Sequence, residues 1–227
     1  MKAEYTKLLR DFLGQVQYEL PRHRYDLALE SLVHEYFLPV RTLLPTWALT
    51  VPKEAQRWPF YLRLKSGIAE AYAWMAFPPA LYPENTHFRV YLLAVPELTY
   101  VFNAVNEIFS FHKECIVGTE RSNFVSNVAI ANSVSPLRAL ELLCDETIQA
   151  MRRVRSILSV KPGMKQDIEP LFHGYILYHL SQTRYRLAEL HIPEAREACN
   201  LMKGTLFQDH TPSGHIEKRA TGNGQAW

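Results

Sequence analysis

Three oxygen-bearing side chains stand four residues apart in the middle of the chain. Asn106, Ser110 and Glu114 occur within the apolar stretch "FNAVNEIFSFHKECI". Positions four apart on an α-helix differ by only about 40° around the axis, so these side chains form one polar stripe. An amide carbonyl, a hydroxyl and a carboxylate are hard oxygen ligands, which suit Mg²⁺ better than zinc. The spacing therefore indicates a magnesium site on a helix.

The charge of this ligand set indicates a second component. The three side chains supply one formal negative charge, so a bound Mg²⁺ would need an anion such as a phosphate to complete its shell. Lys113, next to Glu114 in the chain, could reach the same anion. In the alternative interpretation, Asn106 and Ser110 are incidental and Glu114 is a solvated surface charge.

The elements that would position these side chains are helices. Apolar residues recur with helical spacing along most of the chain, and alternation of period two is nearly absent. Ser135-Pro136 is a good N-cap followed by an N1 proline. Pro96 lies inside a helical pattern and should kink or split that helix. The expected helices are residues 2–18, 24–38, 60–76, 86–113, 135–158, 165–190 and 193–203.

The chain as a whole is expected to form one all-α domain. It has 227 residues, of which 48% are hydrophobic and 21% are charged, as is typical of a single globular domain. We expect the helical domain to cover residues 1–206. We expect residues 207–227, which are polar and rich in glycine, to be a disordered tail.

Composition also limits the partners and the compartment. A formal net charge of +2 gives no field strong enough to indicate binding to nucleic acid or to an anionic membrane. No apolar run approaches the roughly 18 residues of a membrane span, and the amino terminus does not resemble a secretory signal. The three cysteines lack paired spacing, which favours a reducing compartment. We therefore expect a soluble cytoplasmic protein.

Three motifs carry a resemblance to a known family. "NEIFSFHKE" resembles the second metal-binding motif of class I terpene cyclases, N-D/E-x-x-S-x-x-K-E. "HGYILYHLSQTRYRLAEL" resembles the carboxy-terminal arginine-tyrosine motif of the fungal trichodiene synthase group, and "WPFYLRLKSGIAEAYAWMAFP" resembles the helix that carries the diphosphate-sensing arginine. The motifs occur in the family's order. The chain is thus similar to the carboxy-terminal part of a class I terpenoid synthase-like helical bundle, amino-terminally truncated.

The resemblance implies a sesquiterpene cyclase of fungal secondary metabolism. Such an enzyme uses Mg²⁺ to ionise farnesyl diphosphate and then cyclises the carbocation. Asn106, Ser110 and Glu114 would bind the metal. The side chains that would hold the diphosphate are Arg63, Lys113, Arg184 and Tyr185.

A carbocation also needs a dry pocket with aromatic rings nearby. The candidate lining residues are Tyr72, Trp74, Phe77, Tyr100, Phe102, Phe109 and Tyr178. The alternative interpretation of each ring is ordinary core packing.

Alternatives also apply to the polar residues of the last motif. Arg184 and Arg186 could each form an ion pair on the helix face, for example with Glu189. His173 and His179 are six residues apart, which puts them on different faces of a helix, so they do not indicate a metal site.

One departure from the family pattern leaves three hypotheses. Class I cyclases carry an aspartate-rich motif, D-D-x-x-D/E, whereas no two aspartates are adjacent in this chain. Without it, ionisation should weaken by several kcal/mol, at roughly 3 kcal/mol for each lost contact.

The chain would be a cyclase, or an impaired homologue that binds an isoprenoid diphosphate or assists a companion cyclase, or a helical interaction protein. A homodimer or a companion cyclase could cover the pocket wall exposed by the missing helices.

Overall fold

Helices make up the part of the chain that the structure describes. The computed structural model describes residues 1–16, 52–66, 68–120 and 123–208, and no strand occurs among them. No helix within these ranges is long and apolar enough to cross a membrane. The helices are α1 (Lys2–Gln15), α3 (Trp58–Ser66), α4 (Ala69–Met75), α5 (Glu84–Phe111), the π-helix η3 (His112–Val117), α6 (Phe124–Asn132), α7 (Pro136–Leu158), α8 (Met164–Ser181), the short 3₁₀ helices η4 (Thr183–Tyr185) and η5 (Leu187–Leu190), and α9 (Pro193–Gln208). The expected all-α class is confirmed.

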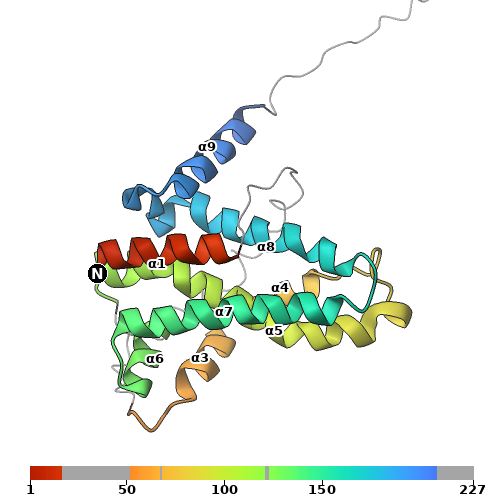
Figure 1. The fold of residues 1–227 in the computed structure, drawn as a ribbon, viewed down its shortest axis with the longest axis horizontal. Helices are drawn as coiled ribbons and strands as arrows, with labels where there is room; N and C mark the ends of the chain where they lie inside the picture. Colours follow the sequence, from red (N-terminus) through yellow and green to blue (C-terminus); the bar gives the residue numbers. More distant parts are fainter. Residues whose placement is uncertain (17–51, 67, 121–122, 209–227) are drawn as a thin grey trace, which may run out of the picture.

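Helix α5 is the centre of the bundle. It packs along α7 and contacts α4 and α8 as well, and Figure 1 shows it behind α7. From Val101 to Phe111 nearly every side chain of α5 is buried, as expected for a helix surrounded by other helices. Polar side chains on this stretch must therefore find partners inside the protein.

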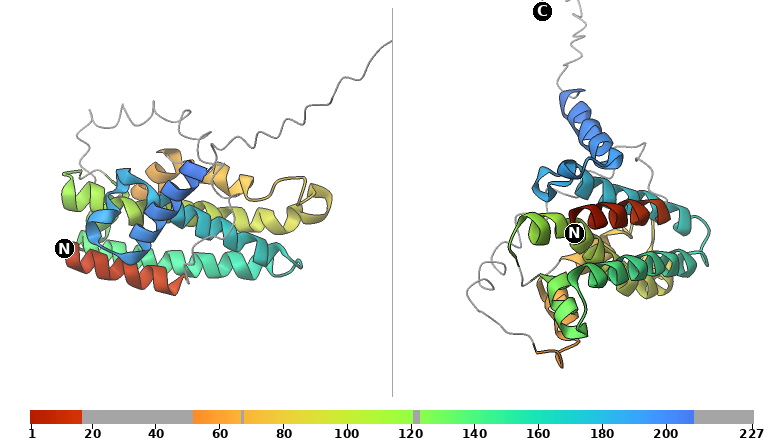
Figure 2. Two further views of the ribbon diagram at one scale, coloured as in Figure 1. Left: turned by 90° about the horizontal axis from the view of Figure 1, so that it is seen from above. Right: turned by 60° about the vertical axis from the view of Figure 1, so that its left-hand side comes forward.

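Helix α7 covers one side of α5. It begins at Pro136, and the hydroxyl of Ser135 accepts a hydrogen bond of 3.2 Å from the backbone N–H of Arg138. The N-cap expected from the sequence is thus confirmed. Helix α1 packs against α7, and the two lie side by side in both Figure 1 and Figure 2.

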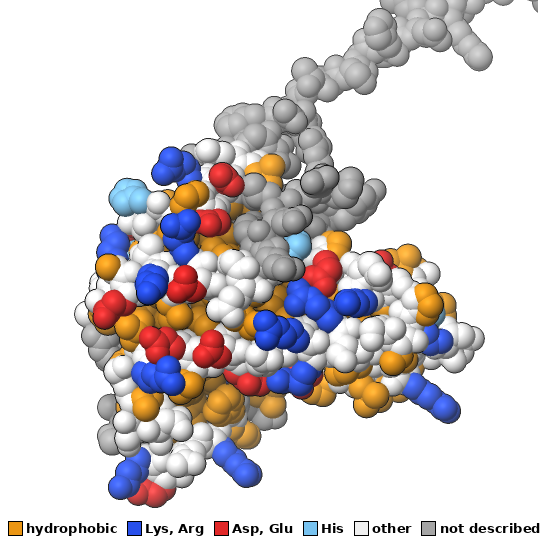
Figure 3. Space-filling view, viewed as in Figure 1, with side chains coloured by type: hydrophobic (Ala, Val, Ile, Leu, Met, Phe, Trp, Pro, Cys, Tyr) orange, Lys and Arg blue, Asp and Glu red, His pale blue; other side chains and the backbone are white. Residues whose placement is uncertain are grey.

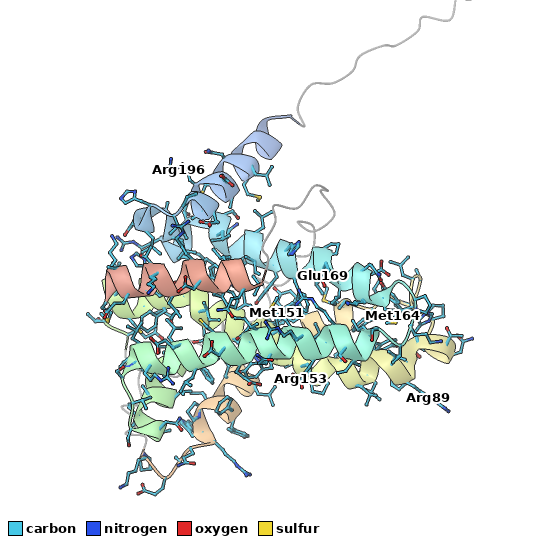
Figure 4. All side chains as sticks on the ribbon, in the orientation of Figure 1. Arg89, Met151, Arg153, Met164, Glu169 and Arg196 are labelled. Atoms are coloured by element: carbon cyan, nitrogen blue, oxygen red, sulfur yellow. The ribbon has the colours of Figure 1, made fainter. Side chains whose placement is uncertain are left out.

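An ion pair ties α7 to α8. Glu169 projects from α8 toward α7 in Figure 4, and Arg155 of α7 donates to its two carboxylate oxygens over 2.6 and 2.7 Å. The same guanidinium lies 5.3 Å from the ring centre of Phe172. A bidentate pair of this kind fixes orientation as well as distance, so α8 has a defined rotation relative to the core.

One expected helix in the middle of the chain was wrong. The helix expected over residues 60–76 is two helices, α3 and α4, because Ile68 at the start of α4 has φ −103° and ψ 5°, outside the helical region. Pro96 does not split its helix, because α5 continues through it. The helix that begins at Phe124, α6, was not expected.

The carboxy-terminal part also differs from expectation. The helix expected over residues 165–190 ends at Ser181, since Gln182 is extended and Arg186 is left-handed at φ 60°. The arginine-tyrosine motif therefore lies on the 3₁₀ helix η4. Helix α9 runs to Gln208, two residues past the expected end of the helical domain. The helix expected over residues 24–38 and the tail beyond residue 208 lie outside the described residues.

Candidate functional site

Arg63 joins helix α3 to helix α5. Its Nη2 donates a hydrogen bond of 3.0 Å to Oδ1 of Asn106, and its Nε lies 3.0 Å from Oε1 of Glu107. The Nε–H does not point along a hydrogen-bond direction, so the second contact is an ion pair. The Arg63 side chain is 19% exposed and that of Glu107 is 9% exposed. Arg63 thus lies within the bundle and not on its surface.

The amide nitrogen of Asn106 faces α8 and η4. Nδ2 lies 3.2 Å from Nε2 of His179 and donates a hydrogen bond of 3.2 Å to the hydroxyl of Tyr185. Nδ1 of His179 lies 2.7 Å from the backbone carbonyl of Tyr175. Because a carbonyl only accepts, Nδ1 carries the proton and Nε2 accepts from Asn106. The orientation of the amide is therefore fixed, with its oxygen toward Arg63.

Two more cations surround the ring of Tyr185. Nζ of Lys113 lies 5.5 Å from the ring centre, and the guanidinium carbon of Arg184 lies 5.1 Å from it. Nε of Arg186 lies 2.7 Å from Oε1 of Glu189. The ion pair that the sequence allowed for either arginine is thus formed by Arg186, while Arg184 faces the site.

Positive charge is concentrated around one buried ring. Burial lowers the pKa of His179 to about 3. The hydrogen bond to the Tyr175 carbonyl opposes this shift, and the charges of Arg184, Arg63 and Lys113 add to it. These cations come from η4, α3 and η3, so three elements bring positive charge to the same end of α5. A cluster of guanidinium and ammonium groups suits phosphate oxygens.

The oxygen ligands expected for Mg²⁺ lie at this end of α5. Ser110 is 3% exposed and Glu114 is 7% exposed, so Glu114 is not a solvated surface charge. Oε1 of Glu114 lies 3.0 Å from Nζ of Lys113. In a similar way, Oδ1 of Asn106 accepts a hydrogen bond from Arg63. The carboxylate of Glu114 and the partly buried amide oxygen of Asn106 are hard oxygen donors that suit Mg²⁺, and both now pair with basic side chains.

Residues 51–222 match the trichodiene synthase family. This segment holds all three motifs and every expected site residue. The chain belongs to the trichodiene synthase family. The resemblance expected from the sequence is thereby confirmed.

Its relatives include fungal terpene synthases. The (E)-beta farnesene synthase of Metarhizium brunneum is 41% identical over 139 residues, which cover 61% of this chain and 42% of that protein. Terpene synthase BipA of Cochliobolus sativus is 36% identical over 137 residues, 60% of this chain and 41% of that protein. Trichodiene synthase of Stachybotrys chartarum is 29% identical over 135 residues, 59% of this chain and 35% of that protein. The matched part of the chain spans between 35% and 42% of these relatives' length.

Four of the aromatic candidates of this trichodiene synthase family member lie beside the site. The rings of Tyr72 and Phe102 lie 5.8 and 4.8 Å from the ring of Tyr175, whose carbonyl binds His179. Phe109 lies 5.6 Å from His179, and Tyr178 lies 6.2 Å from Tyr185. Phe102 and Phe109 are fully buried. Their role as pocket lining stays a prediction.

Of the other three candidates, Phe77 and Trp74 lie apart from the site, whereas Tyr100 lies in a groove beside it. Phe77 stacks on Tyr91 at 4.9 Å, and Trp74, 40% exposed, packs edge-on against the same ring. Tyr100 lines a groove of about 190 Å³ that Arg63 and Glu107 also line, and its role as pocket lining stays a prediction. Figure 3 shows hydrophobic side chains gathered between α7 and the α3–α6 pair.

Two residues of the site were not expected from the sequence. The sequence indicated no role for His179, because its spacing from His173 does not indicate a metal site. In the structure its Nε2 accepts the hydrogen bond that orients the Asn106 amide. Glu107, the residue after Asn106, pairs with Arg63. The proximity of His179 to the arginine-tyrosine motif was the available signal, since it lies on the helix that leads to Tyr185.

The neutral state of His179 should make stability depend on pH. The unfolded chain protonates this ring near the ordinary pKa of about 6.5, whereas the folded protein does so near 3. Between these values the unfolded state binds the extra proton, so the free energy of unfolding falls as pH drops. We expect urea denaturation from about pH 7 to pH 4 to show this loss, and His179→Gln to show a shallower loss. If the free energy of unfolding fell equally with pH in the wild type and in His179→Gln, the lowered pKa would not belong to His179.

Proposed function

We propose that this chain acts in the ionisation of an isoprenoid diphosphate, as a class I sesquiterpene cyclase on farnesyl diphosphate. The observation that carries the proposal is the fixed amide of Asn106. Its oxygen and nitrogen sides are held by separate helices at the point where three cations gather. The substrate's chain length comes from the family and the names of the relatives.

The residues have separate roles in this proposal. Asn106, Ser110 and Glu114 would hold Mg²⁺. A metal at this position would neutralise the charge that grows on the leaving diphosphate. The basic side chains and Tyr185 would bind the diphosphate oxygens through charge-assisted hydrogen bonds.

The surroundings of the site add a second requirement. An allylic carbocation must be kept from water, and the rings of Phe102 and Tyr175, which meet edge-on at 4.8 Å, lie in a buried aromatic group next to Asn106. Aromatic faces stabilise cations by electrostatic attraction. This group could line the end of the pocket nearest the diphosphate.

A second candidate function rests on the aspartates of the sequence. None of the five is adjacent to another, so the chain offers no aspartate-rich motif for further metal ions. It could therefore bind an isoprenoid diphosphate without turnover or assist a companion cyclase, as a homodimer or a mixed complex. We place either function in the cytoplasm, in keeping with the unpaired spacing of the three cysteines in the sequence.

Incubation with Mg²⁺ and farnesyl diphosphate distinguishes the two candidates. A cyclase yields a hydrocarbon detectable by gas chromatography, whereas a binding protein shows Mg²⁺-dependent heat with pyrophosphate in calorimetry and no product. In both cases Ser110→Ala should weaken Mg²⁺-dependent binding by roughly tenfold, because a ligand is lost. Ser181→Ala is the control, since that buried hydroxyl only donates to its own helix at the Tyr178 carbonyl. Absence of both product and binding would reject the proposal.

A further inference from the structure

Helix α5 changes its winding in the middle of the metal motif. The α-helix ends at Phe111 and continues without interruption as the π-helix η3. A π-helix has roughly 4.4 residues per turn, or about 82° per residue, compared with about 100° in an α-helix. The step from Ser110 to Glu114 therefore totals about 364° and not about 400°. Glu114 is thereby brought back over Ser110, which improves the stripe that the sequence indicated.

Gly118 is required where the π-helix ends. Its φ of −83° and ψ of 177° are open to any residue, so torsion does not explain the glycine. Space does, because a Cβ at this position would lie 2.6 Å from the carbonyl oxygen of Lys113 and 3.0 Å from that of Glu114. The N–H of Gly118 also donates to the Lys113 carbonyl over 3.0 Å. A larger residue would have to displace the backbone of both charged residues.

Tyr5 contacts the turn where the π-helix begins. Its hydroxyl donates a hydrogen bond of 2.9 Å to the backbone carbonyl of Ile108. In an α-helix that carbonyl accepts the N–H of His112. Burial raises the pKa of Tyr5, and the N–H of His112 faces the same hydroxyl and opposes this shift. The Tyr5 hydroxyl thus lies at the carbonyl of Ile108 and the N–H of His112, where α5 passes into η3.

The ring of Tyr5 is held as firmly as its hydroxyl. It is fully buried, stacks on His112 with the ring centres 6.2 Å apart, and lies 5.4 Å from the ring of Phe111. Two turns further along α1, Phe12 meets Phe109 at 6.3 Å. Two rings of α1 thus contact the carboxy-terminal end of α5, and α1 also packs on α7 and η3.

The position of α1 in the chain makes this contact notable. Residues 2–15 precede the segment 51–222 that matches the family. The hydroxyl that contacts the metal motif therefore comes from a part of the chain that the family match does not cover. Tyr5 makes no hydrogen bond to an expected ligand in the contacts described above, although the charge of Glu114 adds to the rise in its pKa. Its hydrogen bond acts on the ligands through the backbone of α5 and η3.

We propose that Tyr5 and Gly118 are positioning residues for the carboxylate of Glu114 and the ammonium of Lys113. Tyr5 fixes the turn where the π-helix begins, and Gly118 leaves room for the turn where it ends. Helix α1 thereby becomes part of the scaffold of the site. The importance of this geometry for metal and diphosphate binding rests on the proposed function, whereas the geometry itself does not.

Tyr5→Phe in the full chain tests the role of the hydroxyl. The variant keeps the ring and its packing and loses one buried hydrogen bond. We expect hydrogen exchange at the backbone amides of residues 112–118 to become roughly three- to tenfold faster. Binding of pyrophosphate in the presence of Mg²⁺, measured by calorimetry, should weaken by roughly the same factor.

Tyr82→Phe is the matched control. The Tyr82 hydroxyl also donates a hydrogen bond of 2.9 Å, to the carboxylate of Asp167 on α8, and it lies outside the contacts of η3 described here. This variant should keep both the exchange rates of η3 and the affinity of the wild type. Equal changes in Tyr5→Phe and Tyr82→Phe would reduce the effect to general destabilisation and overturn the proposal.

Gly118→Ala provides an independent variant at the other end. Its added Cβ should accelerate exchange in η3 and weaken Mg²⁺-dependent pyrophosphate binding by roughly tenfold or more, with the overall helical circular dichroism retained. Wild-type exchange in both Tyr5→Phe and Gly118→Ala would overturn the proposal. A wild-type protein that binds no pyrophosphate would reject the proposed function, and the exchange rates would still decide the positioning role.

Discussion

Asn106→Ala is expected to weaken Mg²⁺-dependent binding of pyrophosphate by roughly 100-fold or more, and to remove any turnover with it. The substitution deletes a metal ligand and the acceptor of Arg63. It also deletes the N–H donors that face His179 and Tyr185, so α8 and η4 each lose a hydrogen bond to α5. Calorimetry with pyrophosphate and Mg²⁺ measures the affinity, and gas chromatography with farnesyl diphosphate measures the turnover.

Two further variants make the Asn106 result specific. Asn132→Ala removes an exposed amide whose Nδ2 donates to the carbonyl of Val128 in its own helix, and it should bind as the wild type does. Asn106→Asp keeps an oxygen ligand but presents a carboxylate to Nε2 of His179, which is an acceptor. Its affinity for pyrophosphate in the presence of Mg²⁺ should lie between those of the wild type and Asn106→Ala. A folded Asn106→Ala protein with wild-type affinity would exclude this amide from the site.

The sequence predicted the helices of the core well because their patterns are local. The N-cap at Ser135 and the apolar face of α7 follow from residues that lie within a few turns of one another. The stripe of Asn106, Ser110 and Glu114 was predicted in the same way. The role of Arg63 could not be derived from such a pattern and came from the resemblance.

The breaks between helices were harder to predict. The pattern of "SQTRYRLAEL" continues the helical period past Ser181, although the helix ends there. The backbone turns at Arg186 and His191, which have φ values of 60° and 56°. Arg186 is not a residue type that favours the left-handed region, and His191 favours it far less than glycine does, so composition gave little signal. The π-helix of η3 likewise depends on contacts from α1 that local spacing cannot reveal.

The network around Asn106 was beyond sequence reasoning for a related reason. His179 and Asn106 are 73 residues apart, and only the packing of α8 on α5 brings them together. A lone histidine on an apolar helix face is more often a core residue than a ligand. The structure shows a third role, in which the neutral ring accepts a hydrogen bond and fixes an amide.

Arg63→Met is expected to weaken pyrophosphate binding by about 10- to 100-fold, because a guanidinium can hold two phosphate oxygens at once. Methionine fills a similar volume without charge, so packing against α5 should largely persist. The carboxylate of Glu107 loses its guanidinium partner, and the free energy of unfolding should fall by roughly 1–3 kcal/mol. Urea denaturation measures the second effect separately from the first.

Glu107→Gln separates the two roles of Arg63. It breaks the same ion pair and should lower stability by a similar amount, but it keeps the guanidinium in the site. If Arg63 binds the diphosphate, Glu107→Gln should bind pyrophosphate at least as well as the wild type, because Glu107 competes with the anion for the same cation. If Arg63 serves only to hold α3 against α5, the two variants should lose affinity equally. A shared loss would therefore remove Arg63 from the diphosphate site and leave it a structural residue of the bundle.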